Sequence, residues 1–355
     1  MLGKLLSLLL FIFLIAHTQN ALCQGKVDLV KVDGTSVNIY TPPNYALDKK
    51  YQVVYFNDGQ MLFGHPSMSM SLQGTLDSLI YNKHIEPLLV VGVAADRLRT
   101  EKYVPYQDDR FERLPDGSSY ADYYAKYLVE KVIPYVDTRY STITQPEGRA
   151  IFGFSFGGLN ALWMMFNYPE VFSMSAGLSA SFWVDDFAMF NEAKKYQSGQ
   201  KVWFDIGTAE WNYYVPFQKL LSENGAKVNQ EVFYSEVPYG LHNMKDWKER
   251  IEMPFLVFAG LKSQEIAKME VEIEIIPSQS TPGKKFTRLN PIVTCKNGLV
   301  YSLAHEAKYD VLNPDAGKVY EEGRFELFGS ENLEVIVSYM EFKKKIKIRA
   351  KLLEN

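Results

Sequence analysis

The pentapeptide GFSFG at residues 153–157 places Ser155 between two segments with different hydrophobic patterns. Residues 149–152 form a short, mostly apolar run typical of a buried strand, whereas residues 158–168 repeat apolar side chains at helical spacing. A glycine stands two positions from the serine on either side, which lets a strand and a helix pass close together. The sequence therefore predicts a sharp strand-to-helix turn that presents a nucleophilic serine.

A serine nucleophile of this kind needs an acid and then a histidine further along the chain. Residues 201–207 predict a strand that ends in a turn carrying Glu210, and residues 230–237 predict the next strand, followed by a loop with His242. Such loops follow the carboxyl ends of strands, where sites form in open α/β sheets. Asp205, inside the first of these strands, is the alternative acid.

The position of His242 distinguishes it from the other histidines among the five in the chain. The others lie in the N-terminal segment, before the serine, or in a different kind of sequence: His17, His65, His84 and His305. We therefore expect Ser155 as nucleophile, His242 as general base and Glu210 as the residue that orients the imidazole. These residue types predict acyl transfer through a covalent acyl-enzyme.

Acyl transfer also needs backbone donors for the developing oxyanion. The N–H of Phe156, directly after the nucleophile, is one candidate. The second is the N–H of Gln60 or Met61, because these residues follow an apolar strand at residues 51–56 and an Asp-Gly turn. An ordinary Asp-Gly turn without a role in chemistry is the alternative. Candidate substrate-binding side chains are Phe154, Trp183 and Trp211, which could equally belong to the core.

Strand and helix signals alternate from residue 24 to residue 262, and the runs at residues 51–56 and 88–93 are almost entirely apolar. Continuous apolar strands suit a parallel sheet covered on both faces. We therefore predict an α/β domain with a mostly parallel sheet over residues 24–262. Residues 263–355 instead alternate apolar and charged side chains with period two, as in residues 269–275, and predict a small, sandwich-like all-β domain.

The N-terminal residues 1–23 have a lysine, a short apolar run and small residues before Gln24, the layout of a cleaved signal peptide. We expect a secreted or periplasmic protein with no stable membrane span after cleavage. Cys295 would then be the remaining cysteine, with a structural role. The formal net charge of −4 gives no basic surplus for nucleic acid, and 47% hydrophobic residues allow a large core.

Five motifs in this order resemble the putative esterase family, which includes esterase D, feruloyl and acetyl-xylan esterases and enterochelin esterase. The motifs are YQVVYFNDGQMLF, DRLRTEKYVPY, RAIFGFSFGGLNALWMMFNYPEVFSMSAGLSASFW, DIGTAEWN and PYGLHNMKDWKERI. The resemblance covers roughly residues 35–262 and leaves the β-rich segment uncovered. The chain departs from the polysaccharide-esterase branch at residues 57–60, where NDGQ replaces a His-Gly-rich loop.

The resemblance implies the α/β-hydrolase fold, with no cofactor and no metal, and a nucleophile, acid and histidine at Ser155, Glu210 and His242. It also implies a small-molecule or carbohydrate-linked ester as substrate. The expected function is that of an exported serine esterase. An acyltransferase that uses the same acyl-enzyme is one alternative. A catalytically inactive carbohydrate-binding or adhesion protein on a hydrolase scaffold is the other.

Overall fold

The computed structural model describes residues 24–353 except 66, 111–118, 211–213, 278–284 and 304. The predicted signal peptide at residues 1–23 and the candidate Trp211 therefore lie outside the described residues. In the described part of the chain, no helix is both long and apolar enough to cross a membrane.

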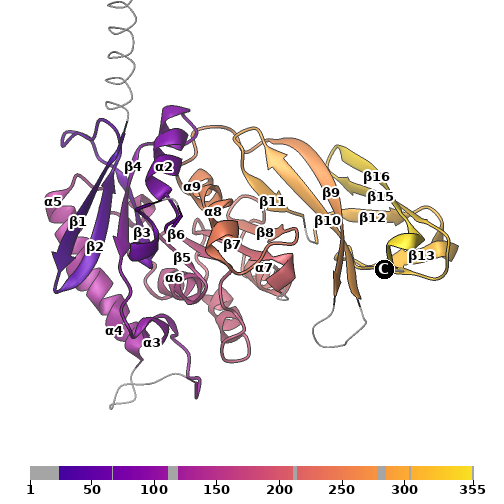
Figure 1. The fold of residues 1–355 in the computed structure, drawn as a ribbon, viewed down its shortest axis with the longest axis horizontal. Helices are drawn as coiled ribbons and strands as arrows, with labels where there is room; N and C mark the ends of the chain where they lie inside the picture. Colours follow the sequence, from indigo (N-terminus) through magenta and orange to yellow (C-terminus); the bar gives the residue numbers. More distant parts are fainter. Residues whose placement is uncertain are drawn as a thin grey trace, which may run out of the picture.

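A central sheet of eight strands, in the order β1-β2-β4-β3-β5-β6-β7-β8, lies at the centre of the larger part of the molecule (Figure 1). Strands β3 to β8 run parallel, whereas β1 and β2 form an antiparallel edge. The strand bounds are Lys26–Val32 (β1), Thr35–Thr41 (β2), Gln52–Asn57 (β3), Leu88–Val93 (β4), Arg149–Phe154 (β5), Met174–Leu178 (β6), Lys201–Gly207 (β7) and Val232–Val237 (β8). All residues of β4, β5 and β6 are buried, which explains their apolar sequences.

Helices cover both faces of this sheet, as the sequence predicts. One face packs against α3 (Arg99–Tyr103), α4 (Tyr120–Tyr127), α5 (Ile133–Arg139), α6 (Phe156–Asn167) and α7 (Val215–Glu223). The other face packs against α2 (Leu72–Tyr81), α8 (Met244–Lys248) and α9 (Glu252–Ala259). The sequence predicts one helix over residues 246–261, whereas the structure has two. Pro254 lies in the first turn of α9, and its ring would clash with the Arg250 carbonyl in a continuous helix.

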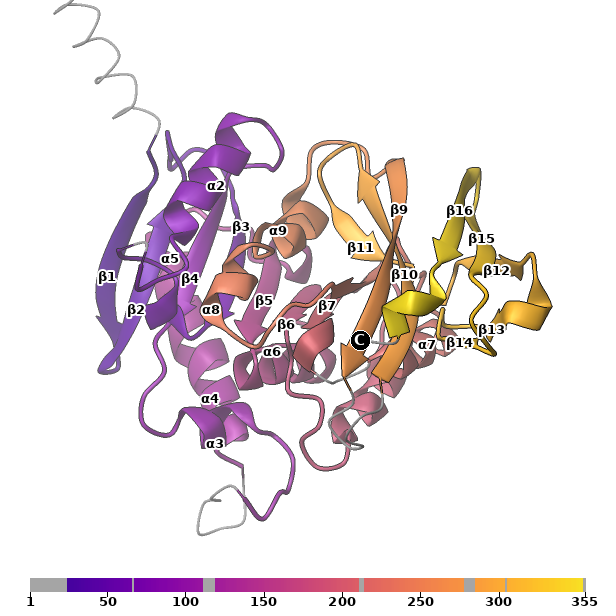
Figure 2. The same ribbon diagram turned by 45° about the vertical axis from the view of Figure 1, so that its right-hand side comes forward.

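The C-terminal segment is rich in β-strands, as predicted, and its strands pair antiparallel. It lies beside the β8 edge of the central sheet (Figure 1 and Figure 2). It contains the sheets β11-β10-β9, β12-β15-β16 and β13-β14. The bounds are Ile266–Pro277 (β9), Lys285–Cys295 (β10), Val300–Ser302 (β11), Lys308–Val311 (β12), Gly317–Val319 (β13), Phe325–Leu327 (β14), Leu333–Tyr339 (β15) and Phe342–Ile348 (β16). The acidic strand β9 pairs with β10, and the basic strand β16 pairs with β15.

The β-rich segment shares a continuous apolar core with one face of the sheet. Phe233 of β8 and Tyr301 of β11 contact each other edge to face at 5.6 Å. Cys295 is buried in the same core, and burial raises the pKa of its thiol to about 11. A buried ion-pair cluster crosses the same junction, because Arg288 of β10 binds Glu236 of β8 at 2.5 Å and Glu274 of β9 at 3.0 Å. The β-rich segment thus supports the end of β8.

Candidate active site

The turn between β5 and α6 places Ser155 in a strained backbone conformation, with φ 56° and ψ −124°. Such conformations are rare for residues with a side chain and cluster at functional sites. The turn depends on its flanking glycines, because a Cβ on Gly153 would lie 2.2 Å from the Gly157 carbonyl oxygen. Side chains at those positions would push β5 and α6 apart. The sequence therefore folds into the sharp strand-to-helix turn, or elbow, that the GFSFG motif predicts.

The structure brings Ser155, His242 and Glu210 into one line of hydrogen bonds. His242 Nε2 lies 2.9 Å from Ser155 Oγ, and His242 Nδ1 lies 2.7 Å from Glu210 Oε2. Glu210 ends the short turn Thr208–Glu210 after β7, and His242 lies in the loop between β8 and α8. The Glu210 carboxylate is nearly buried, with 3% of its side chain exposed, whereas 45% of the His242 side chain is exposed. The imidazole is thus accessible to a substrate, while the nearly buried Glu210 carboxylate binds its Nδ1.

Asp205, the alternative acid, has both carboxylate oxygens bonded elsewhere. Its Oδ1 accepts from Arg250 Nε at 2.9 Å and from the Ser179 N–H at 3.0 Å, and its Oδ2 accepts from Trp203 Nε1 at 3.0 Å. Burial raises the pKa of Asp205 above its usual range, and the neighbouring Arg250 guanidinium opposes this effect. The geometry favours Glu210 as the partner of His242.

Trp247, which the sequence analysis did not single out, supports the imidazole. Its ring meets the His242 ring edge to face, with the ring centroids 4.9 Å apart, and the Phe154 ring stacks on Trp247 with the centroids 5.2 Å apart. Phe154 has no exposed surface. A buried Phe154 cannot touch a substrate, as we expected it to do. It contacts Trp247, which in turn contacts His242. The only sequence signal for Trp247 was its place in the motif that contains His242.

The turn after β3 lies beside the elbow and is held by buried polar contacts. The fully buried Asp58 binds Arg99 through both carboxylate oxygens, each at 2.6 Å, and its N–H donates to Tyr103 Oη at 3.0 Å. Asn57 Nδ2 donates to the Gly157 carbonyl at 2.8 Å, which ties the turn to α6. Arg99, Tyr103 and the start of α6 thus hold the NDGQ segment in place.

The two candidate donors in this turn differ in their backbone contacts. The Met61 N–H donates to the Asp58 carbonyl at 2.8 Å and closes the turn Gly59–Met61. The side chain of Gln60 is also fixed, because its Oε1 accepts from the Ala95 N–H at 2.9 Å. Since the Met61 N–H is engaged within the turn, the geometry favours Gln60 over Met61 as an oxyanion donor.

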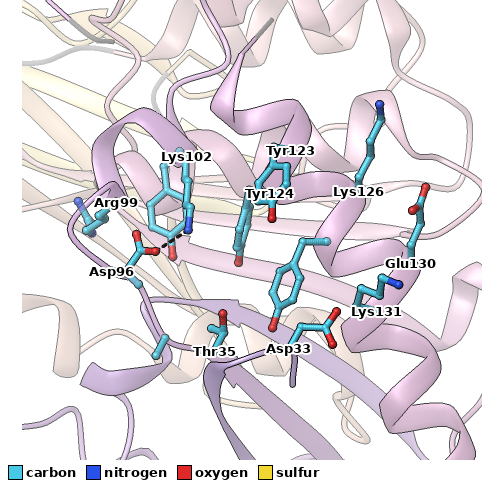
Figure 3. Close-up of a pocket in the computed structure, with 14 residues that line it drawn as sticks. Asp33, Thr35, Asp96, Arg99, Lys102, Tyr123, Tyr124, Lys126, Glu130 and Lys131 are labelled. Carbon is cyan, nitrogen blue, oxygen red and sulfur yellow. Dashed lines mark hydrogen bonds and ion pairs between the residues drawn. The ribbon is translucent and has the colours of Figure 1, made fainter. Parts of the chain in front are cut away.

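A cavity of about 450 Å³ lies next to the side chains that hold this turn (Figure 3). Its lining includes Arg99 and Tyr103, which bind Asp58, and Tyr124, whose hydroxyl donates to Asn57 Oδ1 at 2.6 Å. Charged side chains of both signs surround these aromatic rings, including the ion pair between Lys102 and Asp96. The catalytic candidates do not line this cavity.

Trp183 and Phe156 lie together next to the elbow. Their rings meet edge to face at 5.7 Å, and the Arg110 guanidinium lies 4.9 Å from the centre of the Trp183 ring. Trp183 is 37% exposed, so its ring is available to a ligand.

Ser181, which was not predicted from the sequence, places its Oγ 3.3 Å from Ser155 Oγ. Among the described residues, no group of three or more His, Cys, Asp or Glu side chains could hold a metal ion.

A mostly parallel sheet with helices on both faces and a serine elbow defines an α/β hydrolase. Residues 33–254 match the protein family described as "Putative esterase", and the chain belongs to this family. The matched segment ends before the β-rich segment. Membership of this family supports the hydrolysis of carboxylic esters.

Individual relatives are distant. The uncharacterized protein YbbA of Bacillus subtilis (strain 168) is 23% identical over 212 residues, which cover 59% of this chain and 82% of YbbA. The solved structure of a ferulic acid esterase superposes with a TM-score of 0.51 at 15% identity, covering 66% of this chain and 98% of the esterase. The ferric enterobactin esterase of Salmonella typhimurium gives 0.53 at 19% identity, covering 66% of this chain and 57% of that chain. At these identities the solved structures show a shared fold.

Proposed function

We propose that the protein is a serine esterase that forms an acyl-enzyme on Ser155. The observation that carries this proposal is the line of hydrogen bonds from Glu210 Oε2 through both nitrogens of His242 to Ser155 Oγ, at 2.7 and 2.9 Å. An ionised carboxylate at Nδ1 keeps the proton on that nitrogen and leaves Nε2 free to accept the serine proton. This arrangement favours an active enzyme over an inactive binding protein.

In the first step Ser155 Oγ bonds to the ester carbonyl carbon while its proton passes to His242 Nε2. The carbonyl oxygen becomes an oxyanion, for which the N–H groups of Phe156 and Gln60 are the proposed donors. The carbon–oxygen bond to the alcohol then breaks, and the alkoxide takes the proton from His242. A water molecule repeats these steps on the acyl-enzyme, releasing the free acid and restoring Ser155.

The proposed substrates are esters with an aromatic or sugar group next to the scissile bond. The partly exposed Trp183 ring beside Phe156 supports this class, because aromatic side chains bind flat apolar groups of a ligand. The names of the ferulic acid and enterobactin esterases fit the same class. Feruloylated sugars, acetylated xylan and catecholate lactones are therefore the esters to compare with p-nitrophenyl acetate.

A fluorophosphonate probe tests the nucleophile directly. Peptide mass spectrometry should place one adduct on Ser155, and an adduct on another residue would contradict the proposal.

A second experiment distinguishes an esterase from an acyltransferase by the product formed when glycerol is present in excess. An esterase yields mainly free acid, whereas an acyltransferase yields mainly the glycerol ester.

We also propose that the protein is exported. The basis is the sequence of residues 1–23, with its short apolar run and small residues before Gln24. Mass spectrometry of protein recovered from its host should find an N-terminus at or near Gln24. An intact N-terminal segment on membrane-bound protein would instead support an uncleaved anchor.

A further inference from the structure

The hydroxyl of Ser179 lies at the centre of a buried hydrogen-bond cluster behind Glu210. Ser179 follows β6 directly, has φ 47° and is 1% exposed. Its Oγ lies 2.6 Å from Glu210 Oε1, 2.8 Å from Trp247 Nε1 and 2.7 Å from Arg250 Nη2. None of these contacts reaches Ser155, so the cluster acts on the catalytic serine only through other residues.

The three partners of Ser179 fix the position of its hydroxyl proton. An indole N–H and a guanidinium can only donate, so both lone pairs of the hydroxyl oxygen are taken by Trp247 and Arg250. The single hydroxyl proton must then point to the remaining partner, the Glu210 carboxylate. A serine hydroxyl, which normally rotates freely, is here a fixed donor to Glu210 Oε1.

Asp205 holds the Arg250 guanidinium in the orientation that this requires. Arg250 Nε donates to Asp205 Oδ1 at 2.9 Å, while Arg250 Nη2 lies 3.6 Å from Glu210 Oε1. Both members of the Arg250–Asp205 pair are buried, with 7% and 0% of their side chains exposed. The Arg250 charge is therefore balanced mainly by Asp205, and Arg250 Nη2 donates to Ser179 while it stays in a longer ion pair with Glu210.

The two oxygens of Glu210 consequently have different partners. Oε1 accepts from Ser179 Oγ and from the Gly207 N–H at 2.8 Å, and Oε2 faces His242 Nδ1. We propose that Ser179, Arg250 and Asp205, here called the Glu210 clamp, are positioning residues that hold the carboxylate so that Oε2 alone orients His242. This inference rests on the proposed serine esterase function.

Ser179→Ala tests the clamp most directly. Loss of one hydrogen bond to a charged group should lower kcat for p-nitrophenyl acetate by about 10- to 100-fold. KM should stay within about twofold, because the clamp residues are buried and contact Glu210 rather than Ser155. The downfield proton signal of His242 Nδ1–H should broaden or move in the same variant. Trp247→Phe, which removes one donor to Ser179 and keeps an aromatic ring beside His242, should cost less than Ser179→Ala.

A double-mutant cycle separates positioning from general stability. If Ser179 acts through Glu210, then Ser179→Ala should have little further effect on kcat in a Glu210→Ala background. A loss of the same size in both backgrounds would overturn the proposal. Ser175→Ala is the matched control, because Ser175 is a buried serine on β6 whose hydroxyl has no partner among the described residues. It should keep wild-type kcat.

Ser179→Gly guards against a folding defect, because glycine accepts a positive φ without strain. It should reproduce the kinetic loss of Ser179→Ala with a folded circular dichroism spectrum. Wild-type kcat in either folded variant would refute the clamp. Failure of the proposed function gives a different result, since Ser155→Ala would then keep its turnover whatever Ser179 does.

Discussion

His242 Nδ1 lies 2.7 Å from the Oε2 of Glu210, a residue in the turn after β7. The neighbouring Asp205 within β7 is fully buried and bound to Arg250. The two acids therefore have separate tasks, one towards the imidazole and the other towards a buried cation. We therefore expect substitution of Glu210 to act mainly on kcat, and substitution of Asp205 to act mainly on the free energy of unfolding.

Glu210→Gln should lower kcat by about 10³- to 10⁴-fold, because an amide no longer stabilises the imidazolium and can bind the wrong tautomer. Asp205→Asn should lower kcat less, and should reduce the free energy of unfolding by up to about 3 kcal/mol because it leaves the buried Arg250 charge unbalanced. Kinetics and urea unfolding of both variants provide the check. The opposite ranking in kcat would identify Asp205 as the acid.

A histidine base makes activity depend on pH with a defined sign. His242 can accept the Ser155 proton only when its imidazole is neutral, so kcat/KM should fall as the pH drops and the imidazole becomes protonated. Initial rates with p-nitrophenyl acetate between pH 5 and 8 measure this. A flat acylation profile over that range would be incompatible with His242 as the base.

Arg99 should matter for the turn that carries Gln60, the proposed oxyanion donor, although Arg99 is not one of the proposed catalytic residues. Arg99→Met would leave the buried Asp58 carboxylate without a cation, which costs about 3–5 kcal/mol of stability for a buried pair. Because Gln60 lies in the same turn, kcat should fall as well, by at most about 10²- to 10³-fold. Urea unfolding and kcat are measured together, with Asp58→Asn/Arg99→Met as the charge-balanced control. A destabilised variant with unchanged kcat would exclude this turn from the oxyanion hole.

Arg288 should be a main contributor to the junction between β8 and the β-rich segment. Arg288→Met leaves Glu236 and Glu274 buried and unpaired, and should reduce the free energy of unfolding by about 3–5 kcal/mol. Lys268→Met removes a cation from an exposed ion pair with Glu270, and should change it by less than about 1 kcal/mol. Urea unfolding of both variants tests this, and equal effects would refute a special role for the cluster.

The sequence was sufficient for the elements whose signals are local. The elbow at Ser155 follows from two glycines between a strand and a helix, and His242 follows from its place after β8. Ser179 and Trp247 carried no comparable signal. Their roles come from side chains that meet only after β6 and α8 are packed together.

One difference between the predicted and the observed fold has a local physical cause. The apolar pattern of residues 246–261 predicts one helix, but Pro254 cannot lie inside a continuous helix, and the structure has α8 and α9 instead. The predicted boundary between residues 262 and 263 follows a change in pattern from period 3.6 to period two. The pattern gave no sign of the Phe233–Tyr301 contact or of the core that crosses this boundary.

Turnover of p-nitrophenyl acetate by Ser155→Ala tests the proposed nucleophile most directly. We expect a loss of about 10⁴- to 10⁶-fold in kcat with an unchanged circular dichroism spectrum, and a similar loss for His242→Ala, because the two residues act as one unit. A folded Ser155→Ala protein with turnover close to the wild type would contradict the central claim that Ser155 is the nucleophile.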